Sequence, residues 1–216
     1  MMRGLGEPDR TLLLDSMHRH RYQAGEFLMR QGEPGDTLHL IEAGHVAAQV
    51  TTGDGLVATL NLMGPGDVLG EMSLVEEGGV RTASIVAVDR VETLALARPV
   101  FERLRVERPE IDRFLITLLV DHVVRLSAQL RDAYVASAET RIVRRLLALA
   151  ISYRVGDRPI EVPVDQGTLA RLAGASRQTA NRVLRSAQDE GWLVIGRRRL
   201  EITDFDRLLK RAESGE

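Results

Sequence analysis

Three patterns in the sequence predict an α+β protein built of a β-sandwich of the jelly-roll type, a long helix and a winged helix-turn-helix. Short apolar runs broken by Gly and Pro fill residues 22–96, a pattern typical of sandwiches with many short strands. Apolar residues alternate by three and four over residues 116–133, as in a coiled coil. Residues 166–185 fit two short helices joined by a tight turn.

These patterns divide the chain into three parts. We expect a sandwich domain at residues 1–108, a dimerisation helix with a hinge at residues 109–136, and a winged helix-turn-helix domain at residues 137–216. The charge follows a similar division, because residues 135–216 hold 15 basic and 11 acidic side chains whereas the residues before them hold 14 and 20. An acidic first part and a basic last part fit a sensor joined to a domain that binds a polyanion.

The composition excludes several classes of protein. The chain has 216 residues, of which 44% are hydrophobic, and it contains no Cys, so disulfides and thiolate metal sites are excluded. No apolar run approaches the ~18 residues of a membrane span, and residues 1–10 do not have the pattern of a signal peptide. We therefore expect a cytoplasmic protein that makes no contact with a membrane.

The first part is expected to contain one helix and several short strands. Pro8–Met17 predicts an amphipathic helix, and the basic cluster His18–Arg21 follows it. A solvated basic surface explains this cluster better than a metal site, because no third ligand lies at a useful spacing. The strands are expected at Phe27–Met29, Leu38–Ile41, Val46–Val50, Val57–Leu62, Ala83–Val88 and Val91–Leu96.

A long helix is expected from Pro109 onward, after a small helix at residues 98–104. Flanking Asp and Arg side chains favour an exposed seam that pairs with a second copy of the chain, and the alternative is a helix packed on its own domain. The helix ends at a hinge, residues 134–137, where Ser137 can cap the next helix. The seam residues are Ile116, Leu119, Val123, Leu126, Leu130 and Ala133.

Residues 70–84, GEMSLVEEGGVRTAS, contain the residue types that bind a sugar phosphate. A Gly-led turn into a helix leaves backbone N–H groups that favour an anion. Arg81 can add a forked cationic donor and Thr82 a hydroxyl, while Glu71 can accept hydrogen bonds from a sugar hydroxyl. The residues alone also allow a surface loop with an ordinary Glu–Arg pair.

The 20 residues from Gln166, QGTLARLAGASRQTANRVLR, match two helices that cross at a tight turn. Small residues are needed at the fifth and ninth positions, where Ala170 and Gly174 stand, and Ser176 stands where the second helix needs an N-cap. The second helix would enter the major groove of DNA with its N-terminus first, whereas the alternative is an ordinary helical hairpin. The apolar positions hold Leu169, Ala173, Ala175, Ala180 and Val183.

The outward side chains of this second helix suit the edges of bases. Arg pairs with the two acceptors of guanine, and Gln or Asn pairs with adenine. A hairpin at residues 192–203 follows, with Arg197, Arg198 and Arg199 at its tip, which is a wing aimed at phosphates. Asp204 can cap a last short helix. The candidate DNA contacts are Ser176, Arg177, Gln178, Asn181, Arg182, Arg197 and Arg198.

Over nearly its whole length the chain resembles the catabolite activator protein (Crp/Fnr) family of bacterial transcription regulators. Gly-Glu, nine further residues and Arg-Thr-Ala resemble the family's phosphate-binding cassette, and SRQTANRVL resembles its recognition helix. The stretches GEFLMRQGEPGDTLHLIEAGHV and LMGPGDVLGE resemble the same sandwich. The resemblance implies a homodimer that binds cyclic AMP and a palindromic site in double-stranded DNA, with no metal and no enzyme activity.

The resemblance also implies roles for residues of the cassette. Glu71 would hold the ribose 2′-hydroxyl, and Arg81 with Thr82 would hold the cyclic phosphate. The backbones of Gly70 and Met72 would line the site.

On the long helix, Ser127 keeps the position that reaches the partner subunit's ligand. Leu126 stands where the cyclic-AMP receptor has Thr, and it cannot hydrogen-bond the base. The phosphate and ribose are therefore better supported than adenine, and cyclic GMP stays a second candidate ligand.

At the DNA and polymerase surfaces the resemblance implies further contacts. Arg177, Gln178 and Arg182 would read bases, although the family usually has Glu at the position of Gln178. His18, His20 and Arg21 match positions where family activators present a basic surface to RNA polymerase. The iron–sulfur branch of the family is excluded by the missing Cys.

Two other classes of function fit the sequence less well. A DNA-binding protein that needs no ligand, with the sandwich as a dimerisation scaffold, is the alternative that the cassette residues Glu71, Arg81 and Thr82 argue against. An enzyme that hydrolyses cyclic nucleotides would need paired carboxylates and a His cluster for metals, and the sequence has no such cluster.

Overall fold

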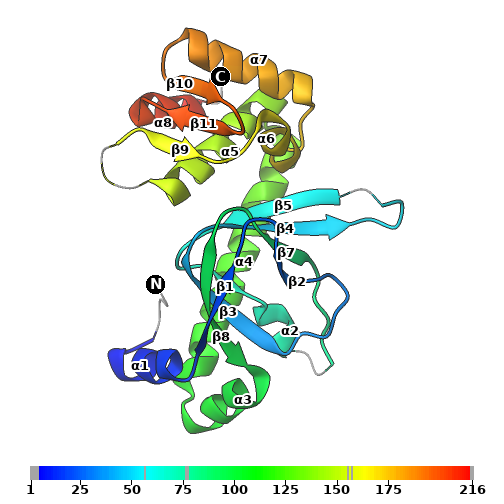
Figure 1. Cartoon of the computed structure of the whole chain (residues 1–216), viewed down its shortest axis with the longest axis vertical. Helices are drawn as coiled ribbons and strands as arrows, with labels where there is room; N and C mark the ends of the chain where they lie inside the picture. The colour runs from blue at the N-terminus through cyan, green and yellow to red at the C-terminus, as the bar shows by residue number, and fades with distance from the viewer. Residues whose placement is uncertain (1–4, 56, 76–77, 155, 157, 215–216) are drawn as a thin grey trace. The chain divides into compact units, whose positions relative to one another are not determined.

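The computed structural model confirms the α+β architecture (Figure 1). The chain forms two compact units, one from Met1–Val57 with Leu62–Ser127 and one from Ala58–Asn61 with Ala128–Glu216. No helix in the described part of the chain is long and apolar enough to cross a membrane. The structure describes residues 5–55, 57–75, 78–154, 156 and 158–214.

Residues 18–97 form two antiparallel sheets of four strands each, in the orders β1-β8-β3-β6 and β2-β7-β4-β5. All six predicted strands form, and β1 and β6 are additional. β1 coincides with the predicted basic cluster, which is an exposed edge strand paired with β8 from His18↔Ala95 to Tyr22↔Val91. The bounds are β1 (His18–Tyr22), β2 (Phe27–Met29), β3 (Thr37–Ala43), β4 (Val46–Thr51), β5 (Val57–Met63), β6 (Val68–Leu69), β7 (Ser84–Ala87) and β8 (Val91–Ala97).

Two apolar clusters hold this unit together. One lies between the sheets and includes Met29, Ile41 and Ile85. The other packs the opposite face of the first sheet, through Leu38 and Leu40, against helices. Burial of such side chains is the main stabilising term of the domain. The helices are α1 (Glu7–Asp15), α2 (Glu71–Val75), α3 (Arg98–Glu107) and α4 (Glu110–Val135).

Helix α4 has two different surfaces along its length. Its first turns bury Ile111, Phe114 and Leu115 in the apolar cluster between the first sheet and the helices. Leu119 packs against the same core, so the predicted seam is wrong at this position. The exposed apolar stripe passes through Val120 instead. Val120 lies four residues after Ile116 and shares its exposed face, whereas Leu119 lies four residues after buried Leu115 and shares the face that packs on the core. The stripe consists of Ile116, Val120, Val123, Leu130 and Tyr134, with Val124 and Leu126 beside it.

The second unit packs four helices with a three-stranded antiparallel sheet, in the order β10-β11-β9. The predicted caps at Ser137 and Ser176 form, each accepting the backbone N–H three residues on, and Asp165 does the same for α6. Asp204 accepts the N–H of Arg207 at the start of α8, as predicted. The bounds are α5 (Ala138–Tyr153), β9 (Ile160–Val162), α6 (Gln166–Leu172), α7 (Arg177–Asp189), β10 (Leu193–Gly196), β11 (Arg199–Ile202) and α8 (Phe205–Ser214).

Small and apolar residues let α6 and α7 approach each other. Leu169, Ala170, Ala173 and Ala180 are buried as predicted. Gly174 forms the turn with φ of 57°, a left-handed conformation that favours Gly. The helix-turn-helix predicted from the sequence is therefore present.

Candidate ligand site and nucleic-acid interface

Arg81 lies at the centre of the predicted phosphate site, with only 6% of its surface exposed. Its Nη1 donates to the Ser73 hydroxyl at 2.8 Å and to the Gly70 carbonyl at 3.3 Å. Its Nη2 donates to the carbonyl and the hydroxyl of Thr37, at 2.7 and 2.8 Å. Groups from β3, the Gly70 turn and α2 therefore hold the guanidinium in one orientation.

Two glycines make room for this arrangement. Gly70 has φ of +80°, and a Cβ there would lie 2.3 Å from Arg81 Nη1 and 2.7 Å from the Thr37 carbonyl oxygen. A Cβ on Gly35 would lie 2.1 Å from the Ser73 hydroxyl oxygen. Contacts this short do not occur in proteins, so a side chain at either glycine would displace the groups that hold Arg81.

Charged side chains surround Arg81. Burial lowers the pKa of the Arg81 guanidinium, the Asp36 and Glu71 carboxylates oppose that fall, Arg98 adds to it and Glu33 opposes it. An arginine stays protonated at neutral pH through such shifts. The site therefore combines two fixed cations with three carboxylates, and a bound anion would add a further negative charge.

Arg98 was not predicted from the sequence, yet it supports the site. Its guanidinium donates to the carbonyls of Gly35 at 2.8 Å and Leu74 at 3.1 Å, and to the carbonyl of Ser73. Helix α2 has five residues, so its last carbonyls lack partners within the helix. Arg98 satisfies two of them and thereby fixes Ser73, which in turn accepts from Arg81.

Glu71, the candidate ribose acceptor, is buried at the start of α2 with 7% exposed. Its Oε1 lies 3.8 Å from Nδ1 of His122 on α4. His122 is absent from the residues predicted from the sequence, because it stands far from the cassette along the chain. It lies one helical turn before Leu126, and that spacing is the signal that could have identified it.

The other predicted ligand residues lie at the surface. The Met72 side chain is exposed, which agrees with a role for its backbone alone. Thr82 is exposed next to buried Arg81, and Leu126 and Ser127 are exposed on α4. The structure thus brings Glu71 and Arg81 into one buried cluster and leaves the residues predicted to meet the base open to solvent.

Helix α7, the second helix of the helix-turn-helix, presents one continuous face to solvent. An open hollow of about 640 Å³ runs along this face. Arg185 belongs to it and was not predicted, although it stands seven residues after Gln178 on the same face. Asp189 and Glu190 stand at the C-terminal end of this face, and their negative charge limits the part of the helix that can lie against DNA. The lining residues are Gln178, Asn181, Arg182, Arg185, Ser186, Asp189 and Glu190.

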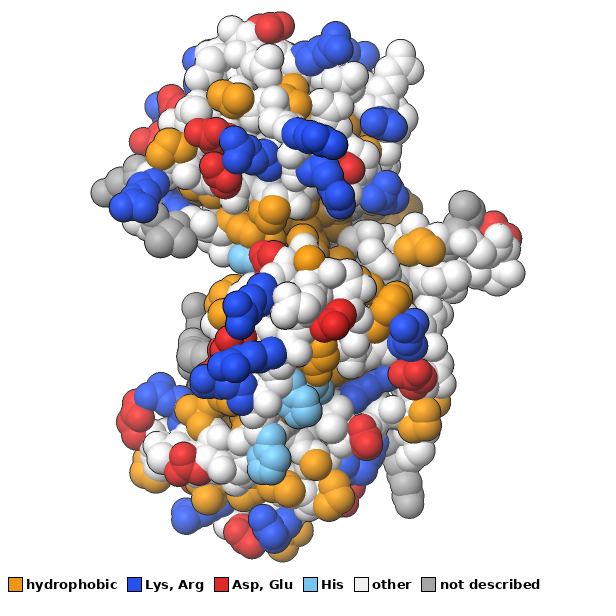
Figure 2. All heavy atoms as spheres, viewed as in Figure 1, with side chains coloured by type: hydrophobic (Ala, Val, Ile, Leu, Met, Phe, Trp, Pro, Cys, Tyr) orange, Lys and Arg blue, Asp and Glu red, His pale blue; other side chains and the backbone are white. Residues whose placement is uncertain are grey.

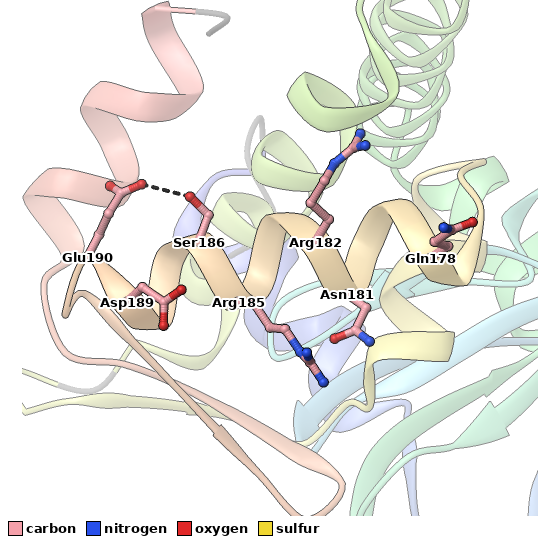
Figure 3. Close-up of a pocket in the computed structure, with 7 residues that line it drawn as sticks. All are labelled: Gln178, Asn181, Arg182, Arg185, Ser186, Asp189 and Glu190. Carbon is pink, nitrogen blue, oxygen red and sulfur yellow. Dashed lines mark hydrogen bonds between the residues drawn. The ribbon is translucent and has the colours of Figure 1, made fainter.

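The side chains on α7 that are predicted to read bases differ in exposure and in hydrogen bonding. Arg177 and Gln178 are exposed. Asn181 is half-buried, and its Oδ1 is buried without a hydrogen-bond partner in the part of the chain that the structure describes. Figure 3 shows Arg182 pointing away from Asn181 and Arg185, and it donates to Glu139 of α5.

The wing carries its positive charge at a two-residue turn between β10 and β11. Arg197 and Arg198 form the turn and are exposed, as predicted. Arg198 has φ of 60°, in the left-handed region. Arg199 is not at the tip, because it pairs with Gly196 in the ladder and its guanidinium lies 3.4 Å from Glu161.

Basic side chains predominate over the C-terminal unit on the face drawn in Figure 2. This agrees with the charge division in the sequence and suits a polyanion. Within the described ranges, no group of three His, Asp or Glu side chains is placed to hold a metal ion.

Comparisons with known proteins match the two parts of the chain that hold these residues. The family model of the cyclic nucleotide-binding domain matches residues 19–108, and that of the Crp-like helix-turn-helix domain matches residues 140–211. The chain is 30% identical to a "CRP-like cAMP-activated global transcriptional regulator" of Mycobacterium tuberculosis, over 88% of this chain and 86% of that protein. It is 34% identical to the "Cyclic AMP receptor protein" of Thermus thermophilus, over 94% and 92%.

A solved structure extends the likeness to three dimensions. The crystal structure of the Thermus thermophilus catabolite activator protein superposes with a TM-score of 0.55 and 32% identity. The match covers 100% of this chain and 99% of that one.

Proposed function

Because the chain belongs to the Crp/Fnr family of transcription regulators, we propose that it binds DNA as a homodimer under the control of cyclic AMP. It carries a cyclic nucleotide-binding domain and a DNA-binding helix-turn-helix domain. Its relatives are transcription regulators and not enzymes. We assign residues 1–108 to ligand binding, 109–136 to the dimerisation helix and hinge, and 137–216 to DNA binding.

The observation that carries the ligand part is the buried pair of Arg81 and Glu71. Arg81 presents a guanidinium already oriented by Ser73 and Thr37, which suits a phosphodiester. Glu71 is a buried acceptor in the same short helix as Ser73, which suits a ribose hydroxyl. An anion that carries a free sugar hydroxyl satisfies both residues, and a cyclic nucleotide is such an anion.

Two residues of α4 bear on the identity of the base. Leu126 has 51% of its surface exposed and offers no hydrogen bond, whereas Ser127 beside it offers a hydroxyl. A site that surrounds a polar group of the ligand with apolar side chains alone discriminates weakly between ligands that differ in that group. Cyclic AMP is supported by the names of the relatives, and we assign cyclic GMP as a weaker ligand of the same site.

The exposed stripe of α4 supports the dimer. Its apolar residues recur at the spacing of a coiled-coil seam from Ile116 to Tyr134. Family members act as dimers, and a two-fold pair would set two recognition helices about 34 Å apart, one turn of DNA. Ligand would control DNA binding by favouring the DNA-competent state of the pair.

The test is an electrophoretic mobility shift assay on a palindromic DNA operator built from two half-sites of the family, with and without cyclic AMP. Calorimetric titration of the nucleotide accompanies it. We expect the protein to bind both the operator and cyclic AMP, and its affinity for DNA to rise when cyclic AMP is present. Arg81→Lys keeps the charge but loses the fork, and it should weaken nucleotide binding ~100-fold or more. The control is Arg30→Lys, since Arg30 stacks on Phe27 at 3.9 Å, outside the cassette.

Two results would overturn the proposal. DNA affinity that is equal with and without nucleotides, in a chain that binds none, supports the ligand-independent alternative. Unchanged nucleotide affinity in folded Arg81→Lys would remove the assigned site.

A contact with RNA polymerase is a second proposal, and β1 supports it. His18 and His20 are exposed on this edge strand. Arg19 and Arg21 on the same strand pair with Glu42 and Glu92, so the surface is less basic than its sequence suggests. We expect weak activation through it. Unchanged transcription from a His18→Ala, His20→Ala double variant, at a promoter that the protein activates, would exclude this contact.

A further inference from the structure

His122 stands beside Glu71, the buried acceptor of the candidate nucleotide site. The imidazole comes from α4, and its Nδ1 lies 3.8 Å from Glu71 Oε1. Its side chain is 36% exposed, against 9% for that of Glu71. A proton can therefore reach the imidazole from solvent, whereas the carboxylate beside it is held inside the unit.

The charges around the site need a further cation when the ligand is bound. Glu33, Asp36 and Glu71 bring three negative charges near Arg81, and Arg98 with Arg81 brings two positive ones. A cyclic nucleotide adds one negative charge. Buried charges of one sign repel strongly unless they are balanced, so a proton on the imidazole next to Glu71 becomes more favourable once the phosphate arrives.

We propose that His122 makes nucleotide binding depend on pH: the protonated imidazole balances Glu71 and the ligand's phosphate, so that cyclic AMP binds more tightly as the medium becomes acidic. This inference rests on the proposed function, because it requires the nucleotide to bind at Glu71 and Arg81. By linkage, a ligand that favours the protonated site takes up protons as it binds. The regulator would then respond to acidification as well as to the nucleotide.

The other titratable groups near the site do not account for such an effect near neutral pH. Burial lowers the pKa of His39 on β3 to about 4, with His20 and Arg81 adding to the fall and Asp36 opposing it, so this imidazole is neutral between pH values of about 6 and 8. His20 on β1 lies beyond His39, with their rings 5.8 Å apart. Arginines and carboxylates keep their charge over this range. The charged groups that face the site or flank His122 are Glu33, Asp36, Glu71, Arg81, Arg98, Asp121 and Arg125.

The experiment is calorimetric titration of cyclic AMP into the full-length protein at pH values of about 6, 7 and 8, at constant ionic strength. We expect the wild-type affinity to fall ~5- to 10-fold from the lowest to the highest value. His122→Arg carries a fixed charge and should bind tightly at every pH. His122→Gln carries none and should bind weakly at every pH. The control variant His18→Gln, on β1, should keep the wild-type slope.

A second readout needs no variant. Titrations at about pH 7 in buffers of different ionisation enthalpy report the protons taken up on binding. We expect a fractional uptake in the wild type that both His122 variants lose.

The outcomes separate this inference from the function on which it rests. A wild type that binds cyclic AMP equally at all pH values, or a His122→Arg variant that keeps the wild-type slope, overturns the role of His122 and leaves the ligand site intact. A chain that binds neither cyclic AMP nor cyclic GMP at any pH overturns the proposed ligand and this inference with it.

Discussion

Arg182 of α7 donates a hydrogen bond of 2.5 Å to the carboxylate of Glu139, in the first turn of α5. Arg182 is a proposed guanine reader, and Figure 3 shows that it points away from Asn181 and Arg185. Both partners are partly exposed, with 70% and 47% of their side chains accessible. Exposed pairs of this kind contribute ~0–1 kcal/mol, so Glu139 stabilises the fold little. In the proposed complex Glu139 would compete with DNA for Arg182.

The first prediction follows from this competition. Glu139→Gln removes the competing carboxylate and one negative charge beside the recognition helix. We expect DNA affinity to rise ~3- to 10-fold, because Arg182 no longer has to leave an ion pair and one repulsion is lost. Fluorescence anisotropy with labelled operator measures the change. Glu213→Gln on α8 removes the same charge elsewhere, and an equal gain in that variant would contradict a specific role for Glu139.

The second prediction concerns the space around Arg81. Gly70→Ala and Gly66→Ala both place a side chain at positive φ, +80° and +94°, which costs ~1–2 kcal/mol of unfolding free energy in each, and Gly70→Ala should cost more because its Cβ also overlaps the Thr37 carbonyl oxygen. The added Cβ at position 70 would overlap Arg81 Nη1, whereas that at position 66 meets nothing within 4 Å. We expect Gly70→Ala alone to lose nucleotide affinity, by more than ~10-fold. Calorimetry on both folded variants decides, and equal losses would argue against the steric explanation.

A third prediction separates stability from DNA binding at the wing. Arg198 has φ of 60°, which costs a residue with a Cβ ~1–2 kcal/mol and costs Gly little. Arg198→Gly should therefore raise the unfolding free energy by ~1 kcal/mol while weakening binding to all DNA sequences alike. The slope of log affinity against log salt should fall by about one. Arg197→Ala is the matched variant, and it should lose affinity without gaining stability in urea unfolding.

The fourth prediction is a pH dependence of stability. Burial lowers the pKa of His39 to about 4, with His20 and Arg81 adding to the fall and Asp36 opposing it, and its Nδ1 lies 3.0 Å from the Thr93 hydroxyl. Between pH about 4 and 6.5 the unfolded chain binds the proton and the folded chain does not. The unfolding free energy therefore falls as the pH drops through this window, by on the order of 3 kcal/mol, and is unaffected by His39 above it.

Urea unfolding of the wild type and His39→Gln at several pH values tests this assignment. The stability of the variant should change less than that of the wild type between pH about 6.5 and 4. The matched variant His18→Gln, at an exposed position of β1, should follow the wild type. Parallel curves for all three proteins would contradict a buried neutral His39.

The fifth prediction concerns the nucleotide base. Leu126 is exposed on α4 and its side chain cannot hydrogen-bond an amino group, so we expect discrimination of cyclic AMP over cyclic GMP to be about tenfold or less. Leu126→Thr should widen this gap by adding a hydroxyl. Competition titrations of both nucleotides measure it. A wild-type preference above ~1,000-fold would mean that another group reads the base.

Local rules explain why so much of the fold was predictable. The caps at Ser137 and Ser176 depend on contacts three residues apart, and the helix-turn-helix depends on small residues at fixed positions such as Ala170 and Gly174. The cassette was predictable for the same reason, since Glu71 and Arg81 stand in one short stretch.

The elements that were missed depend on distant parts of the chain. Strand β1 has the sequence HRHRY and forms because β8 pairs with it, not because of its own apolar pattern. Arg98 and His122 reach the cassette from helices that follow it, so their roles depend on packing. The predicted seam is wrong at Leu119 because a spacing of three and four residues fits two adjacent faces of α4. Packing against the core determines which of these faces is buried.

The hydrogen bonds of Arg81 have a consequence for competition inside a cell. The guanidinium already has four acceptors from Thr37, Ser73 and Gly70, so an incoming anion exchanges existing bonds for new ones and gains less from Arg81 alone than from Arg81 and Glu71 together. Inorganic phosphate, sulfate and chloride can make only this exchange. A ligand that also reaches Glu71 adds a bond that they cannot make, so the proposed nucleotide should be preferred even when it is scarce among abundant metabolic anions.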